Sequence, residues 1–206
     1  MPFRWWRRTR VPAHASAARR EPGEEAYEAR LRLVRDIAEP EDALREVRGL
    51  RANAATHLGP THPVTLAAQF EEAGRAGQVE GPQAAVRLYY NLLEHADAIE
   101  AVSPVLYVDT QWNLGGSLLD AGETRSAVEV LEFAIENARL FFGRNHGTTF
   151  ETRLTHIIAL DGDGRPAEAL ELAEKLVRDA ERVLGPDHPT TADARFAVHH
   201  LNARLD

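Results

Sequence analysis

Residues 184–191 read Leu-Gly-Pro-Asp-His-Pro-Thr-Thr, residues 58–65 read Leu-Gly-Pro-Thr-His-Pro-Val-Thr, and residues 142–149 keep a weaker form of the same phrase. The three copies begin at Leu58, Phe142 and Leu184, so their spacings are 84 and 42 positions. Recurrence at a fixed interval of about 20 to 50 residues is typical of solenoids. The sequence therefore predicts an architecture that repeats every 42 residues.

Small residues support the same period independently. Alanines recur at this interval in two series, Ala43, Ala85, Ala127 and Ala169, and Ala54, Ala96, Ala138 and Ala180. Prolines precede three members of the first series by three positions, at Pro40, Pro82 and Pro166, and proline suits the first position of a helix. Apolar residues recur at steps of three and four, as in Tyr27, Leu31, Val34 and Ile37. The repeated unit is therefore predicted to be a pair of antiparallel helices.

Proline and glycine positions set the expected helix boundaries. A helix from Gly23 pairs with one that runs from Pro40 to Gly59-Pro60, and three further pairs and a last helix follow, at Pro63 to Gly77 with Pro82 to Ile99, Pro104 to Ala121 with Thr124 to Phe142, Thr148 to Gly162 with Pro166 to Leu184, and Pro189 to Leu205. The predicted fold is an all-α solenoid of about four pairs with a C-terminal capping helix. Gly74, Gly77 and Gly81 should loosen the second repeat.

This pattern resembles the tetratricopeptide repeat (TPR) in its 42-residue, kinesin-light-chain-like form, over about residues 24–205. Leu114-Gly115 stands at the Leu-Gly pair of the repeat signature, Leu118 at its tyrosine, and Ala127 with Leu131 at its Ala-x3-Phe. The sequence departs where Gln111 replaces the tryptophan, which follows as Trp112, and where residues 100–104 have lost the turn motif. The resemblance implies a right-handed superhelix whose concave side is lined by the first helix of each pair.

Composition limits the class of protein. Hydrophobic residues make up 44% of the chain but aromatic residues only 7%, a balance that favours helices. Without a long apolar run, a secretory signal or any cysteine, the sequence is interpreted as that of a cytoplasmic protein. Arginine greatly exceeds lysine, and Lys175 is the sole lysine, which suggests a GC-rich bacterial genome.

The residues that could carry chemistry are better explained by structure. His62, His146 and His188 recur one per repeat, too far apart to share a metal ion, and are expected to cap helices or pack in turns. His199-His200 cannot chelate from one helix face, and Asp161-Gly162-Asp163-Gly164 lacks the later ligands of a calcium loop. Gly115-Gly116 is interpreted as a close approach of two helices. We therefore expect no catalytic residues, no metal and no cofactor.

The resemblance also implies which side chains face the concave groove. It places there a column of large apolar residues beside a column of carboxylates, with small or polar residues between them, and the full set is Phe70, Asp109, Trp112, Asn113, Gly116, Glu151, Leu154, Ile158, Asp193, Phe196 and His200. Such a groove suits a protein or peptide with aromatic or aliphatic anchors between basic residues. The alternative is that these apolar residues pack between repeats while the acids are solvated.

The first 22 residues are a segment of different character, interpreted as a disordered tail before a repeat domain at 23–206. Residues 1–20 hold six arginines and no acid, so the net charge of −8 leaves −14 for residues 21–206. The tail contains Arg4, Trp5, Trp6, Arg7 and Arg8, and could dock in the groove of its own or a neighbouring chain and compete with a partner, which would make the protein a regulatory or sensor module. Contact with an anionic membrane through residues 1–10, or no role, remain alternatives.

The acidic body should repel nucleic acid, so none is expected as a partner. An incompletely capped stack could also pair end to end as a homo-oligomer. The first-choice function is a non-catalytic scaffold for protein interactions.

Overall fold

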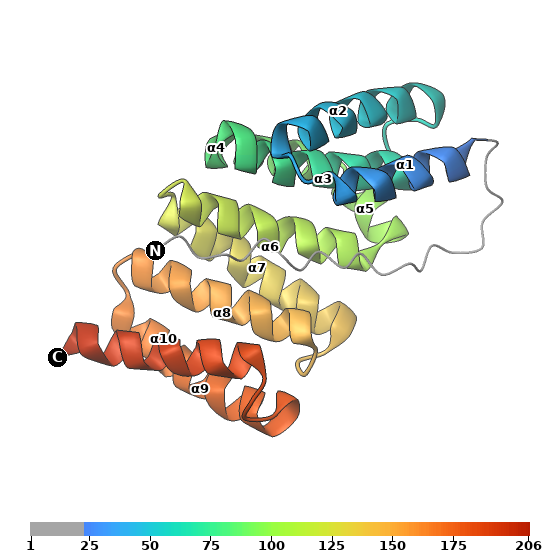
Figure 1. The fold of residues 1–206 in the computed structure, drawn as a ribbon. Coiled ribbons are helices and arrows are strands. Elements are labelled where there is room, and N and C mark those ends of the chain that lie inside the picture. Colours follow the sequence, from blue (N-terminus) through green and yellow to red (C-terminus); the bar gives the residue numbers. More distant parts are fainter. Residues whose placement is uncertain (1–22) are drawn as a thin grey trace.

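The computed structural model describes residues 23–206, and in this range the chain forms ten α-helices (Figure 1). Their bounds are α1 Glu24–Asp36, α2 Pro40–His57, α3 Pro63–Glu80, α4 Pro82–Leu93, α5 Ala96–Val102, α6 Pro104–Asp120, α7 Thr124–Phe142, α8 Gly147–Gly162, α9 Pro166–Leu184 and α10 Pro189–Leu205. Consecutive helices pack as antiparallel pairs, which confirms the predicted all-α solenoid. The basic N-terminal segment and its boundary lie outside the described residues.

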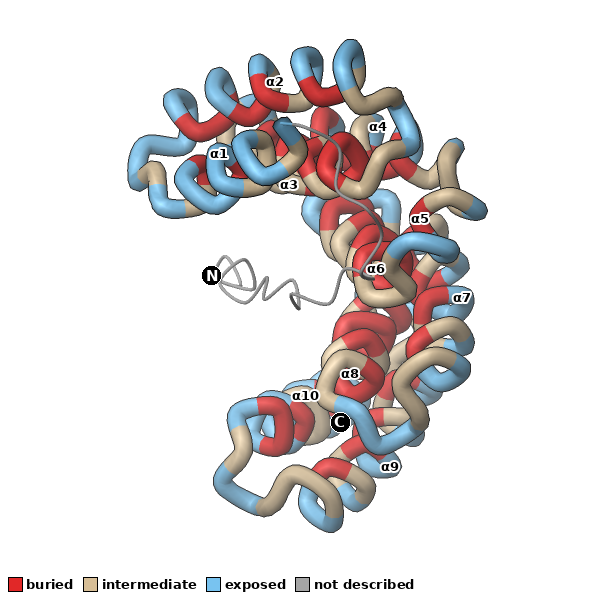
Figure 2. Tube along the Cα trace, turned by 90° about the vertical axis from the view of Figure 1, so that its right-hand side faces the viewer, coloured by how far each residue is buried: buried red, intermediate tan, exposed pale blue. Residues whose placement is uncertain are grey.

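The helices form two layers of a curved stack (Figure 2). The inner layer consists of α1, α3, α6, α8 and α10, and each of these contacts the next member of its layer. The outer layer consists of α2, α4, α7 and α9, which pack against the inner helices beside them. The chain therefore presents a concave face made by the first helix of each pair.

The recurring turn is held by the same three devices each time it occurs. Its glycine has a positive φ, which is 102° at Gly59, 85° at Gly143 and 92° at Gly185. Residues with a Cβ atom rarely adopt this conformation. The threonine at the end of the phrase donates its hydroxyl to the carbonyl of that glycine at 2.8 Å, from Thr65, Thr149 and Thr191. The turn motif thus ties the end of one helix to the start of the next.

Histidine supplies the third device. The Nδ1 atoms of His62, His146 and His188 accept hydrogen bonds from the backbone N–H groups of Val64, Thr148 and Thr190 at 3.3, 3.2 and 3.2 Å. Each histidine is the N-cap of its helix and satisfies a donor that the helix itself cannot pair. The prediction that these histidines cap helices is confirmed.

The second repeat differs from the predicted helix at Pro82 to Ile99. That helix ends at Leu93, and a separate α5 follows, because the N–H of His95 turns back to the carbonyl of Leu92 at 3.0 Å. The break turns Ile99 into the core, where it is fully buried. Ser103 replaces the histidine cap, and its Oγ accepts from the N–H of Leu106 at 3.1 Å. Loss of the turn motif therefore changed the local path but not the stacking.

Two of the glycines inside helices, Gly77 and Gly115, mark close contacts between helices. A Cβ built on Gly115 would lie 2.5 Å from Cγ of Leu131, so α6 and α7 can approach only because Gly115 has no side chain. Gly77 lies inside α3, which runs on to Glu80, and its Cβ would lie 3.0 Å from that of Ala85 in α4. The expected close approach at Gly115 is confirmed, whereas Gly74 and Gly77 do not interrupt their helix.

The recurring alanines occupy the interior of the stack. Ala43, Ala85, Ala127 and Ala169 are fully buried, because a small side chain lets the two helices of a pair approach. Large apolar residues such as Leu50, Leu92, Leu131 and Leu176 fill the space between repeats.

Of the helices described, none is long and apolar enough to cross a membrane.

Candidate functional site

Carboxylates from three inner helices lie within electrostatic reach of one another or of a shared neighbour. Both Glu71 of α3 and Asp109 of α6 act electrostatically on Tyr89, and Glu151 of α8 acts on Asp109. Burial, and next the charge of Glu151, raise the pKa of Asp109 to about 7. The inner helices therefore contribute a group of carboxylates, and among residues 23–206 no cation offsets these two effects on the pKa of Asp109.

Glu71 extends this group of carboxylates but was not among the predicted residues. It stands two positions before Ala73, as the predicted Asn113 stands two positions before Gly115. Arg35 of α1 and Arg75 of its own helix form ion pairs with Glu71 at 3.3 and 3.2 Å. The 42-residue register from Asn113 could therefore have indicated Glu71.

Trp112 joins two repeats on the inner side of the stack. It is half-buried against the core, and its indole Nε1–H donates to Oγ1 of Thr155 at 2.8 Å. The Thr155 hydroxyl in turn donates to the carbonyl of Glu151 at 3.1 Å. These bonds fix the plane of the indole between α6 and α8, and leave part of the ring accessible.

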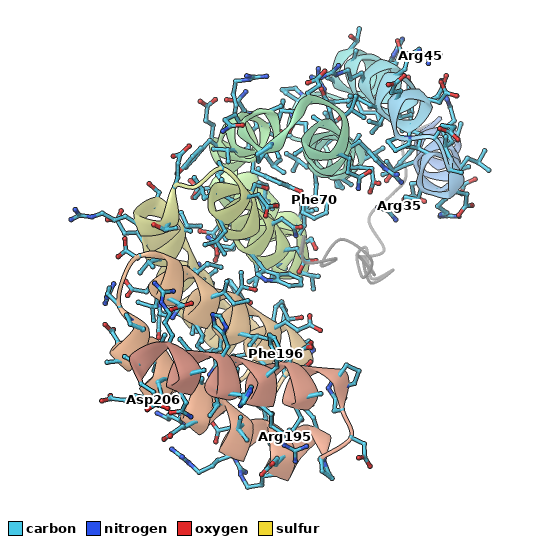
Figure 3. The ribbon with its side chains drawn as sticks, turned by 60° about the vertical axis from the view of Figure 1, so that its left-hand side comes forward. Arg35, Arg45, Phe70, Arg195, Phe196 and Asp206 are labelled. Carbon is cyan, nitrogen blue, oxygen red and sulfur yellow. The ribbon has the colours of Figure 1, made fainter. Side chains whose placement is uncertain are left out.

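The other predicted apolar residues separate into two kinds. Phe70 and Leu154 are only 3% and 1% exposed, and the Phe70 ring packs against Tyr89 with centroids 5.7 Å apart. They support the concave face from beneath and offer a partner almost no surface. Phe196 of α10, by contrast, is 59% exposed (Figure 3). Of the predicted apolar residues, Trp112, Ile158 and Phe196 are therefore the ones that remain at least partly accessible.

The last inner helix adds polar groups beside Phe196. The His200 ring stacks on Phe196 with an interplanar angle of 14° and centroids 6.5 Å apart. Its Nε2 lies 3.5 Å from Asp161 of α8, which also accepts a 2.7 Å hydrogen bond from Arg204. Asp193 lies exposed one turn before Phe196. This end of the face thus combines an exposed ring with charged groups.

The two remaining predicted residues, Asn113 and Gly116, offer a partner little direct contact. Asn113 donates its side-chain amide to the carbonyl of Asp109 at 2.7 Å, so that donor is used within its own helix. A Cβ on Gly116 would meet no atom within 4 Å, so Gly116 opens room beside Trp112. Among residues 23–206, no three histidine or acidic side chains are grouped to hold a metal ion.

Comparison with known proteins identifies the type of solenoid. Residues 158–190 match the family model described as Tetratricopeptide repeat. No match was found among curated proteins. Two crystal structures of the Podosopora anserina putative kinesin light chain nearly identical TPR-like repeats are 20% identical over 89% of this chain, and 87% and 88% of theirs, with TM-scores of 0.73 and 0.72.

The structure of BtubC (BKLC) from P. vanneervenii is similar with a TM-score of 0.62 and 14% identity, over 87% of this chain and 67% of that one. At these identities the likeness establishes the fold. Together with the family match, it confirms the resemblance stated from the sequence.

Proposed function

Because the chain has the fold of a kinesin-light-chain-type tetratricopeptide-repeat solenoid, we propose that it is a non-catalytic scaffold that binds a protein or peptide segment on its concave face. The observation that carries this proposal is the pair of interacting carboxylates Asp109 and Glu151 on successive inner helices; Glu71 on a third inner helix extends the group, although Arg35 and Arg75 already offset its charge. Side chains spread along successive repeats suit an extended ligand, whereas a catalytic site needs its groups around one point.

The chemistry of the face favours a segment with basic and aromatic residues. Carboxylates attract and orient a cationic segment, while accessible rings such as Trp112 and Phe196 offer apolar area for anchors. A cation placed beside Asp109 would also lower the pKa of that carboxyl from its raised value of about 7 and so keep it charged. Binding and ionisation of Asp109 would therefore reinforce each other.

A second candidate function uses the chain's own N-terminal segment. Residues 3–8 read Phe-Arg-Trp-Trp-Arg-Arg, which matches the ligand chemistry that the concave face favours. Tethering gives such a segment an effective concentration of about mM. The protein would then be a regulatory module in which this segment competes with an outside partner, or the segment would bind an anionic membrane surface when released.

Fluorescence anisotropy with a labelled peptide of residues 3–8 tests the first proposal on the whole chain. We expect saturable binding that weakens about fivefold in Glu151→Gln, because one inward carboxylate charge is lost. The matched control is Glu171→Gln, which removes an exposed carboxylate from the outer helix α9. Equal weakening by both variants would mean that the peptide senses only the overall negative charge.

Deletion of residues 1–22 tests the second candidate with the same peptide. If this segment occupies the concave face, its removal should tighten peptide binding about tenfold, since an internal competitor is lost. Unchanged affinity would show that it does not compete there, and the regulatory candidate would be withdrawn while the scaffold proposal remained.

A further inference from the structure

A second surface feature lies on the outer side of the stack, where α8 forms the floor between α7 and α9. It is a cleft of about 490 Å³, within the range of small-ligand sites in proteins. Figure 1 shows these three helices side by side in the C-terminal half of the chain. None of the concave residues discussed above lines the cleft. It is therefore separate from the proposed binding face.

The cleft is basic although the chain is acidic. Five of its lining side chains are permanent cations, namely Arg139, Arg144, Arg153, Lys175 and Arg182, and Lys175 is the sole lysine of the protein. Three acids also line it, Glu132, Glu136 and Asp179. The lining therefore has a net charge of +2, in a chain whose net charge is −8. This excess of positive charge favours an anion.

The cations are not all neutralised by the three acids. Arg139 pairs with Glu136 at 3.0 Å, and Arg153 and Arg182 share Asp179 at 3.1 and 3.5 Å. In the described part of the chain, Arg144 and Lys175 form no ion pair. Burial lowers the pKa of Arg153, and the charges of Arg139 and Arg144 lower it further, against the opposing effect of Asp179. Positive charge is thus crowded around Arg153.

The floor of the cleft contains a polar atom without a partner. His156 is only 7% exposed, and its buried Nε2 has no hydrogen bond. The closest acid atom, Oε1 of Glu132, is 3.7 Å away, which is too far for a hydrogen bond. A buried polar atom left unpaired costs free energy, so Nε2 would gain from an acceptor that reaches it from the adjoining cleft.

We propose that this cleft binds a phosphomonoester dianion, held by Arg144, Arg153 and Lys175 and by a hydrogen bond from Nε2 of His156. Guanidinium groups present several N–H donors in a plane that matches phosphate oxygens, and Lys175 adds a point charge. A dianion would neutralise the net lining charge of +2 and satisfy the open histidine atom. The cleft is large enough to admit more than the phosphate, so the source is either a phosphorylated side chain or a small phosphorylated metabolite.

Isothermal titration calorimetry of the whole chain with phosphoserine tests the site. We expect one equivalent to bind, and Arg144→Ala with Lys175→Ala together to weaken binding at least 50-fold, because two charge-assisted contacts are lost. The matched control is Arg178→Ala, which removes an exposed cation from the same helix as Lys175 but outside the cleft. Absence of binding, or equal weakening in the control, would overturn the proposal.

The pKa of His156, followed by NMR, reports on a direct contact with phosphate. Burial lowers the pKa of His156; Glu132 of α7 and Glu168 of α9 raise it, and Arg165 before α9 lowers it. Bound phosphoserine should raise this pKa clearly more than sodium chloride at the same ionic strength, because only the bound dianion contacts the ring. The His156→Leu variant assigns the NMR signal by its disappearance. A titration curve unaffected by saturating phosphoserine would contradict the proposed contact.

A peptide Ala-Ala-phosphoserine-Ala-Ala distinguishes the two sources. Binding at least tenfold tighter than free phosphoserine would assign the cleft to a phosphorylated protein, since flanking backbone adds contacts. Equal or weaker binding of the peptide would assign it to a small metabolite. Because concave variants such as Glu151→Gln should leave phosphoserine binding intact, the two proposals can fail independently.

Discussion

Equivalent positions carry opposite chemistry at the α2–α3 joint and at the α7–α8 joint, the first and third of the four joints between successive helix pairs. Arg48 of α2 faces Glu72 of α3, and 84 residues later Glu132 of α7 faces His156 of α8. Glu72 is 4% exposed and is bound by Arg48 at 3.2 Å and by Arg51. His156 is equally buried, but its Nε2 remains unpaired. Between them, Leu114 occupies the same place in α6 and is fully buried.

The comparison shows that the repeat fixes how the helices pack, whereas the side chains at equivalent positions can be charged, apolar or unpaired. The first joint closes its buried charge with a network that extends from Arg48 to Glu80 at 2.8 Å. The middle joint, between α4 and α6, has no buried charge at this position because Leu114 is apolar. The α7–α8 joint leaves a polar atom unpaired beside a basic cleft, and that difference is the basis of the phosphate-site proposal.

The largest expected effect is at the first joint. Glu72→Leu, which installs the residue of the middle joint, should lower the free energy of unfolding by about 2 to 3 kcal/mol. Breaking a buried ion pair leaves a charge without its partner, and the partial exposure of Arg48 and Arg51 reduces that cost. Urea denaturation measures the change in the free energy of unfolding. A loss below about 0.5 kcal/mol would mean that the network contributes no net stability.

The α6–α7 contact within a pair tests how closely two helices approach. Gly115→Ala should cost about 1 to 2 kcal/mol, because the added Cβ collides with Leu131 and the penalty exceeds the gain in helix propensity. Gly116→Ala, at the next position, meets no atom and should stabilise the protein by about 0.5 to 1 kcal/mol. Thermal unfolding of the two variants should therefore shift in opposite directions. Shifts of the same sign would contradict the packing at this contact.

Asp109 extends the comparison to a carboxylate that neighbours another carboxylate instead of arginines. Its pKa is raised to about 7, so its contribution to stability is present below about pH 4 and is lost as pH rises through 7. Asp109→Asn should consequently stabilise the protein by about 1 to 2 kcal/mol at pH 8, and much less at pH 5. Denaturation at both pH values measures this, and an equal effect at each would exclude a raised pKa.

The smallest expected effect is at the α7–α8 joint. His156→Leu should change stability by less than about 1 kcal/mol at pH 8, because it removes an unsatisfied atom and not a bond. Burial lowers the pKa of His156, so its neutral form stabilises the fold above about pH 6.5, and this is lost as pH falls. Between pH 7 and 5 the unmodified protein should therefore lose more stability than the variant. A larger loss in the variant would reverse the sign of that linkage.

Much of the fold was predictable because the residues of the turn motif act locally, within the turn itself. The glycine, histidine and threonine of residues 58–65 each have one local task, and the structure confirms them at three turns. The break between α4 and α5 was not predictable, because losing a motif does not say where a helix will end.

The candidate surface was predictable only in part. The 42-residue register predicts which residues face inward, but the burial of Phe70 depends on how closely Tyr89 packs against it, which the register does not contain. The open atom of His156 was likewise hidden, since a histidine on an apolar helix face has the same pattern whether or not it is satisfied.

A charge-reversal experiment tests the proposed concave binding face most directly. Anisotropy of the labelled peptide of residues 3–8 should show a strong loss of affinity in Glu151→Lys, and a peptide with its three arginines replaced by glutamate should bind that variant better than it binds the unmodified chain. Glu171→Lys on the outer layer should produce neither change. If the two lysine variants behave alike toward both peptides, the concave face is not the binding surface.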